Sequence, residues 1–233
     1  MTRYTMRNLC GWCATLALLL TALLVPARAA AQDDITVTKH NFSTLSGRNA
    51  TFTSLASNVA DYGEICVYCH TPHGGQTGAP LWNRAFGAGP YTMYTSPTID
   101  MTIAGTPGDV SLACLSCHDG TIGIDVITNA PNSSTATSIG GTLATIFPTG
   151  PNALKVLGTD LRNDHPIGVT FNTTLDVAFR SQASIEAAGL KFYGASADRV
   201  ECASCHNPHN STNVPFLRRS NAASALCLTC HIK

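Results

Sequence analysis

Hydrophobic residues in this 233-residue chain are concentrated at its N-terminus. Two arginines precede an apolar stretch from Leu9 to Val25, and small residues follow at 27–31. This order is typical of a secretory signal peptide, so we expect residues 1–31 to be cleaved. A retained membrane anchor is the alternative. However, the uninterrupted apolar run from Ala14 to Val25 is shorter than the ~20 residues that a spanning helix needs, so we expect no retained anchor.

Beyond residue 31, the hydrophobic pattern predicts little regular secondary structure. Short helices are predicted at 181–190 and 221–230, and short strands at 120–128 and 169–173. Ser, Thr, Asn, Gly and Pro dominate 128–151, which we expect to be a loop-rich linker. The predicted fold is mostly irregular coil with a few short helices and little or no sheet.

Charged residues are scarce and balanced. They make up 12% of the chain, about half of ordinary usage, with 14 basic and 14 acidic residues. Loss of the expected signal would remove three arginines and leave a mildly acidic protein of 11 basic and 14 acidic residues. Nucleic-acid phosphates select a basic face, so we expect no nucleic-acid partner.

All eight cysteines beyond residue 31 fall into four C-x-x-C-H motifs. This motif is the signature of covalent haem c attachment, in which both thiols bond to the macrocycle and the histidine is the proximal iron ligand. We therefore expect four haem c groups, which would supply much of the interior of the fold. The cysteines and proximal histidines are Cys66, Cys69 and His70; Cys114, Cys117 and His118; Cys202, Cys205 and His206; and Cys227, Cys230 and His231.

Three other interpretations of the cysteines explain the sequence less well. An extracellular location permits four disulfides, but disulfides do not account for a histidine after every pair. Tetrahedral zinc sites would need two C-x-x-C units for each metal ion. Cys10 and Cys13 have the spacing of a thioredoxin-type redox pair, but they lie within the expected signal and no histidine follows them.

Four histidines lie outside the proximal positions, and their number equals the number of distal positions on four irons. They are His40, His73, His165 and His209. We therefore expect bis-histidine ligation of every iron. Met93 and Met101 are the alternative distal ligands, and a methionine would raise the potential of its haem. Bis-histidine iron has no open position for a substrate, so we expect an electron carrier and not an enzyme.

The spacing of the histidines restricts how they can pair. His70 and His73 are three residues apart and can be separated by at most ~10 Å, too little to reach both faces of one haem. His206 and His209 have the same spacing. Each H-x-P-H segment should therefore link two different haems.

The motif order predicts one tetrahaem domain at 32–233. It would contain two paired-haem units, at about 40–123 and about 165–233, on either side of the linker.

The segments Cys202–His209 and Leu226–His231 resemble the doubled C-x-x-C-H multihaem cytochromes of metal-reducing bacteria. The four motifs and the early C-x-x-C-H-T-P-H at Cys66 further resemble extracellular tetrahaem cytochromes that polymerise into filaments. This resemblance implies head-to-tail polymerisation of the chain with itself. It also implies electron transfer to redox partner proteins or to extracellular acceptors such as metal oxides. In such filaments a histidine of one subunit ligates a haem of the next, and His73 is the first candidate for this bridge, with His40 second.

Two further functions stay open at this point. A soluble periplasmic electron shuttle would carry the same motifs, as would a multihaem reductase or its electron-transfer subunit. The expected location is extracellular or on the outer surface, with the periplasm as the alternative.

The motif count yields a first testable prediction. The intact mass of the matured protein should exceed the mass of its polypeptide by four haems, because four complete motifs survive signal cleavage. Mass spectrometry that finds three or fewer haems on fully matured protein would contradict it.

Overall fold

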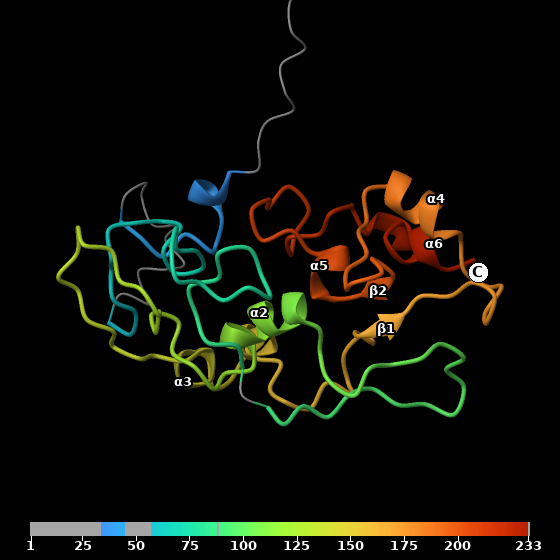
Figure 1. The fold of residues 1–233 in the computed structure, drawn as a ribbon, viewed down its shortest axis with the longest axis horizontal. Coiled ribbons are helices and arrows are strands. Elements are labelled where there is room, and N and C mark those ends of the chain that lie inside the picture. Colours follow the sequence, from blue (N-terminus) through green and yellow to red (C-terminus); the bar gives the residue numbers. More distant parts are fainter. Residues whose placement is uncertain (1–33, 45–56, 88, 233) are drawn as a thin grey trace, which may run out of the picture. The chain divides into compact units, whose positions relative to one another are not determined.

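The structure is a computed structural model, and it describes residues 34–44, 57–87 and 89–232. The expected signal peptide at 1–31 lies outside these residues. Most of the described chain is coil, as predicted, with short helices and one small sheet (Figure 1). In chain order the elements are η1 (Ile35–Val37), α2 (Asp109–His118), α3 (Leu143–Ile146), η3 (Pro151–Lys155), β1 (Val169–Thr170), α4 (Gln182–Ala187), β2 (Arg199–Val200), α5 (Cys202–Cys205), η4 (Ala222–Ser224) and α6 (Cys227–Cys230).

The sheet consists of β1 and β2 in antiparallel register, with Val169 opposite Val200. The strand predicted at 169–173 is confirmed in its first two residues. Val169 also bridges to Ile103, and the amide of Thr170 donates to the carbonyl oxygen of Thr102 at 2.8 Å. A segment of the first predicted haem unit is therefore attached to the sheet of the second.

Both predicted helices are present in shortened form. In the first, α4, the N-cap Ser181 accepts a hydrogen bond from the amide of Ser184, and Ile185 faces the interior with 1% exposure. The helix predicted at 221–230 is divided into η4 and α6. Ala223 interrupts it with a φ of 50°, a left-handed conformation that costs energy in a residue with a side chain.

The strand predicted at 120–128 is wrong, because this segment forms turns. Its backbone groups bind partners other than a neighbouring strand: Ile124 donates to the carbonyl oxygen of Gly141 at 2.9 Å, and the carbonyl oxygens of Gly123 and Ile124 accept from Arg84. The apolar residues that suggested a strand are buried by these turns, with Ile124 only 1% exposed.

The longest helix of the described chain, α2, was not predicted. Ser111 and Ser116 are fully buried on it together with Leu115, so its interior face mixes polar and apolar residues. A mixed face of this kind hides the hydrophobic periodicity from which helices are predicted. The helix ends at His118 and thereby carries the second C-x-x-C-H motif.

The predicted linker at 128–151 is irregular apart from α3 and the start of η3. A capping box between Thr142 and Thr145 begins α3, and Leu143 is buried directly after it. Leu143 packs in a hydrophobic cluster with residues 59–68. The linker therefore packs onto the first haem unit.

Two hydrophobic clusters form the interior, and motif cysteines pack against both. The first cluster is formed by Val59, Ala60, Tyr62, Val67, Tyr68, Ile124 and Leu143, with Cys69 and Cys117 against it. The second is formed by Met101, Val169, Phe171, Ile185, Leu190 and Phe192, with Cys230 against it. Three of the eight motif cysteines therefore lie against the hydrophobic clusters.

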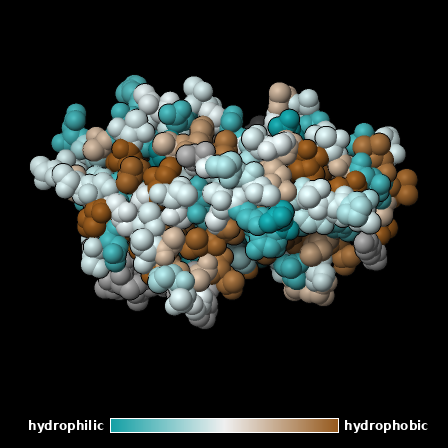
Figure 2. Space-filling view, turned by 90° about the horizontal axis from the view of Figure 1, so that it is seen from below, coloured by the Kyte–Doolittle hydropathy of each residue, from teal (hydrophilic) through white to brown (hydrophobic). Residues whose placement is uncertain are grey.

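The surface is mixed in character. Figure 2 shows one face on which hydrophobic residues are interspersed with hydrophilic ones. Leu154 and Val177 are 83% and 86% exposed. Within the described ranges, no helix combines the length and apolar character that crossing a membrane requires.

Arg84 organises the turns around the second motif. Its guanidinium is fully buried and donates four hydrogen bonds, to the side chain and backbone oxygens of Ser116 and to the carbonyl oxygens of Gly123 and Ile124. These bonds satisfy backbone groups that have no strand partner, and a buried acceptor without a donor is costly.

We predict that Arg84→Met lowers the free energy of unfolding by about 2–4 kcal/mol, because it leaves several buried oxygens without donors. Denaturant unfolding of the haem-loaded protein measures this loss. Arg162→Met is the matched control. Arg162 is exposed and contacts Asp160 on the surface. Its replacement should therefore leave the denaturant concentration at the midpoint of unfolding unchanged. Equal shifts in the two variants would contradict a structural role for Arg84.

Candidate functional site

All four C-x-x-C-H motifs adopt the same local structure, a single helical turn. In the first, third and fourth motifs the histidine amide donates to the carbonyl oxygen of the first cysteine at 2.8, 3.1 and 2.9 Å, and the second motif is the last turn of α2. Residues three and four positions apart lie on one face of a helix. Each turn therefore presents two thiols and one imidazole on the same side, as covalent attachment of one haem requires.

Three motif histidines are oriented by backbone carbonyls. Nδ1 lies 2.7 Å from the oxygen of Pro80 for His70, 2.8 Å from Lys155 for His118, and 2.9 Å from Pro215 for His206. A carbonyl oxygen only accepts, so Nδ1 carries the proton in each ring. The lone pair is then on Nε2, and the hydrogen bond fixes the orientation in which a metal is bound.

Among the described residues, no disulfide joins any of the eight motif cysteines. Burial raises the pKa of Cys69 to about 12 and that of Cys230 to about 11. Both sulfur atoms lie against the hydrophobic clusters, Cys69 at the first and Cys230 at the second.

The second and third motifs lie side by side, because α2 packs against α5. Ser111 of α2 connects them: its hydroxyl donates to the carboxylate of Glu201 and accepts from the amide of Cys202 at 3.0 Å. Cys114 and Cys202 are also close, and the neighbouring thiol of Cys202, together with burial, raises the pKa of Cys114. Two macrocycles attached here would be neighbours.

Two of the four other histidines face motif histidines. The ring centroids of His40 and His118 are 6.2 Å apart, and those of His70 and His209 are 6.1 Å apart. Burial, followed by repulsion from His118, lowers the pKa of His40 to about 4. His40 is therefore neutral at pH 7, the state in which an imidazole binds a metal.

The other two, His73 and His165, have exposed side chains. Nδ1 of His165 lies 3.0 Å from the carbonyl oxygen of Pro166, whereas the backbone oxygen of His73 accepts from the side chains of Thr71 and Asn129. Met101, an alternative ligand in the sequence, is buried in the second hydrophobic cluster. The structure thus brings two of the four candidate distal histidines to a motif.

Buried polar atoms without partners provide a test of whether the sites suit haem. Among the described residues there are three, Trp82 Nε1, Asp164 Oδ2 and Glu201 Oε1. Trp82 packs edge-on to His70 with ring centroids 5.9 Å apart, Asp164 precedes His165, and Glu201 precedes Cys202. Each orphaned atom therefore belongs to a residue that contacts or directly precedes a candidate haem residue. Buried polar groups normally have a partner, and the indole N–H of Trp82 fits a haem propionate, which accepts hydrogen bonds. The carboxylate oxygens of Asp164 and Glu201 also only accept, so they do not fit that group.

Sequence reasoning missed Trp82 and Glu201. The position of Glu201 directly before Cys202 could have singled it out, whereas no local signal marks Trp82.

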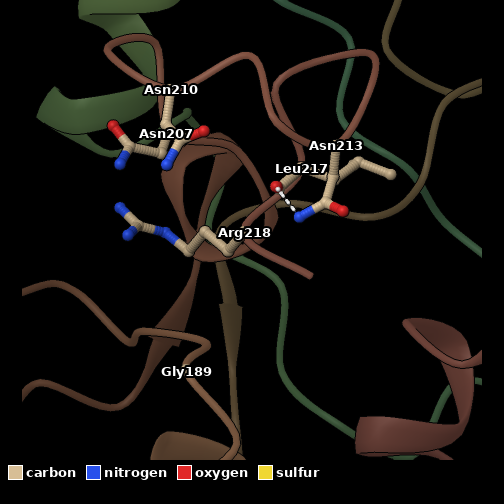
Figure 3. A pocket seen from close by; sticks show the side chains of 6 residues that line it. All are labelled: Gly189, Asn207, Asn210, Asn213, Leu217 and Arg218. Carbon is tan, nitrogen blue, oxygen red and sulfur yellow. Dashed lines mark hydrogen bonds between the residues drawn. The ribbon is translucent and has the colours of Figure 1, made fainter. Parts of the chain in front are cut away.

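A hollow of about 100 Å³ lies in the loop after the third motif and is polar. It is lined by Gly189, Asn207, Asn210, Asn213, Leu217 and Arg218 (Figure 3). The guanidinium of Arg218 donates to the carbonyl oxygen of Ala203 at 2.7 Å, and the amide of Arg218 donates to Cys205 at 2.8 Å. These bonds hold the loop whose Pro215 carbonyl orients His206. The hollow therefore belongs to the loop that positions the histidine of the third motif.

Comparison with known proteins agrees with these local structures. Residues 195–233, which contain the third and fourth motifs, match the family model of the doubled CXXCH motif. No curated protein matches the chain. The match supports a multihaem c-type cytochrome that takes part in electron transfer, with haem c bound covalently at the motifs.

We predict that every iron in the ferric protein is low-spin, because the four expected haems would have eight axial positions and the chain has eight histidines to fill them. Electron paramagnetic resonance and near-infrared magnetic circular dichroism measure this, and Met93→Leu should leave both spectra unchanged. A high-spin ferric signal, or a methionine-to-iron band that this substitution or Met101→Leu removes, would contradict the prediction for the haem concerned.

Proposed function

We propose that the chain is a secreted tetrahaem c-type cytochrome that conducts electrons from haem to haem and polymerises outside the cell into a filament. The observation that carries the electron-carrier function is the pairing of motif histidines with other histidines at 6.1 and 6.2 Å. An iron held by two imidazoles exchanges electrons without offering a coordination site to a substrate, which favours a carrier over a reductase.

The haem groups supply the redox chemistry when bound, and the residues of this chain hold them in place. The cysteine pairs fix each macrocycle at its edge, and the carbonyls of Pro80, Lys155 and Pro215 fix the orientation of three proximal histidines. Orientation matters because the hydrogen bond to Nδ1 tunes the ligand and hence the potential. The contact between Cys114 and Cys202 favours electron passage between the second and third haems.

Polymerisation is supported by the resemblance of the motif order to filament cytochromes and by the exposed side chain of His73. His40 is less suited to bridge subunits, since it faces His118 of its own chain. A histidine that crosses a head-to-tail interface would bring haems of two subunits close together, and such an interface continues into a fibre when it does not close. Extracellular acceptors such as metal oxides are the proposed destination of the electrons.

A soluble periplasmic shuttle is the second candidate. The mildly acidic composition expected after signal cleavage and the mixed surface of Figure 2 are equally compatible with a monomer that docks transiently to redox partner proteins. Electron microscopy of the secreted protein distinguishes the two candidates, because only the first forms filaments.

We predict that His73→Ala keeps four haems attached, abolishes filaments and creates one haem per subunit that binds carbon monoxide. Thr77→Ala, at an exposed position four residues away, is the matched control and should assemble normally. Added imidazole should occupy the opened haem of His73→Ala without restoring filaments, because free imidazole is not attached to a neighbouring subunit. Normal assembly of His73→Ala would place the bridge elsewhere, and a native protein that stays monomeric at high concentration would favour the shuttle.

A further inference from the structure

The two close histidine pairs have a common composition. Each contains one histidine from a C-x-x-C-H motif and one from outside the motifs: His118 with His40, and His70 with His209. The members are distant in sequence, so local chain geometry does not bring them together.

The separation of the rings equals that of two ligands on one metal ion. An imidazole nitrogen binds a metal at about 2.0 Å and lies about 1.1 Å from its ring centroid, so rings on opposite sides of one ion have centroids about 6.2 Å apart. Directly hydrogen-bonded imidazoles, with nitrogens about 2.9 Å apart, would have centroids only about 5 Å apart. The observed distances of 6.2 and 6.1 Å match the first arrangement. The interplanar angles of 84° and 40° do not discriminate, since each ring can rotate about its bond to the metal.

Three of the four paired rings are held by further contacts. Nδ1 of His70 is hydrogen-bonded to Pro80, and Nδ1 of His118 to Lys155, which leaves Nε2 of each ring as the metal-binding nitrogen. His40 stacks on Phe216 with centroids 4.5 Å apart, and its Nδ1 lies 3.3 Å from the carbonyl oxygen of Pro208. The ring of His40 is thus supported from the far half of the chain.

We propose that His209 is the distal ligand of the iron whose proximal ligand is His70, and that His40 is the distal ligand of the iron held by His118. This assignment rests on the proposed bis-histidine cytochrome. It means that the first haem is coordinated by residues from both halves of the chain.

The short segment His206–His209 then contacts three haem sites. His206 is the proximal ligand of the third haem, the carbonyl of Pro208 supports the ligand of the second, and His209 completes the first. His73 and His165 are left for the third and fourth haems, within the chain or across a subunit interface.

The test starts from the full-length haem-loaded protein and the variant His209→Ala. We expect four attached haems by mass and one carbon monoxide bound per chain, whereas the unmodified protein binds none. Adding His40→Ala should raise the count to two, because the two histidines serve different irons. Free imidazole should compete with the carbon monoxide, which shows that the variant has lost a ligand and not its fold.

A second substitution identifies the opened haem. Trp82 contacts His70 and Phe179 contacts His231, with centroids 5.9 and 4.5 Å apart, so each is a local reporter of one proximal ligand. In the His209→Ala background, Trp82→Phe should shift the infrared stretching band of bound carbon monoxide, and Phe179→Leu should not. His209→Met should instead retain six-coordinate iron and raise the potential of one haem.

Absence of carbon monoxide binding in His209→Ala, or a band that moves with Phe179→Leu and not with Trp82→Phe, would overturn the assignment. Binding by the unmodified protein would count against the six-coordinate irons of the proposed function. In that case the assignment of His209 is tested by comparing the number of carbon monoxide molecules bound per chain. His209→Ala should bind one more than the unmodified protein.

Discussion

The hydrogen bond from a motif histidine to a backbone carbonyl is the interaction on which the rest of this structure depends. A C-x-x-C-H turn by itself fixes only the backbone positions from which the cysteine and histidine side chains project. The imidazole ring can still rotate about its side-chain bonds. The carbonyls of Pro80, Lys155 and Pro215 set that rotation for three motifs, and each belongs to a loop or a 3-10 helix. Loop conformation is therefore constrained by ligand geometry, so a chain with almost no sheet can still have one defined structure.

The loops are held in turn by buried polar side chains. These side chains hydrogen-bond the backbone groups that a neighbouring strand would pair in a sheet. Arg84 binds the backbone oxygens of the turn after α2. Asp125, which is fully buried, accepts from the amides of Ala60, Ile139 and Gly140 at 2.7, 2.7 and 3.0 Å. These backbone hydrogen bonds outweigh desolvation and lower the pKa of Asp125, so its carboxylate stays charged. Backbone groups of irregular segments must be paired when buried, and here side chains provide the pairing.

The sequence was sufficient for the coil-rich fold class and for the attachment motifs, because both depend on local composition and spacing. It failed where tertiary contacts decide the conformation. The turns at 120–128 carry strand-like apolar residues, but they are shaped by Arg84 and by Gly141 from distant segments. Helix α2 buries serines that bind Arg84 and Glu201, which concealed its periodicity. The contact between His70 and His209 could not be predicted. The spacing excludes His73 as the partner of His70, but it does not indicate which of the other histidines lies opposite His70.

The motif order suggested two paired-haem units, yet the contacts run between them. Ser111 of α2 binds Glu201 and Cys202 of the second unit, and Val169 of the second bridges to Ile103 of the first. A carrier made of two independent units would have to pass electrons across a variable gap. The buried hydrogen bonds between the units fix the distance between their haems. Separating the units would break the hydrogen bonds of Glu201 and Ser111, which is costly for buried polar groups. The same contacts place Cys114 against Cys202, so the junction that joins the halves mechanically is also where the second and third haems would meet.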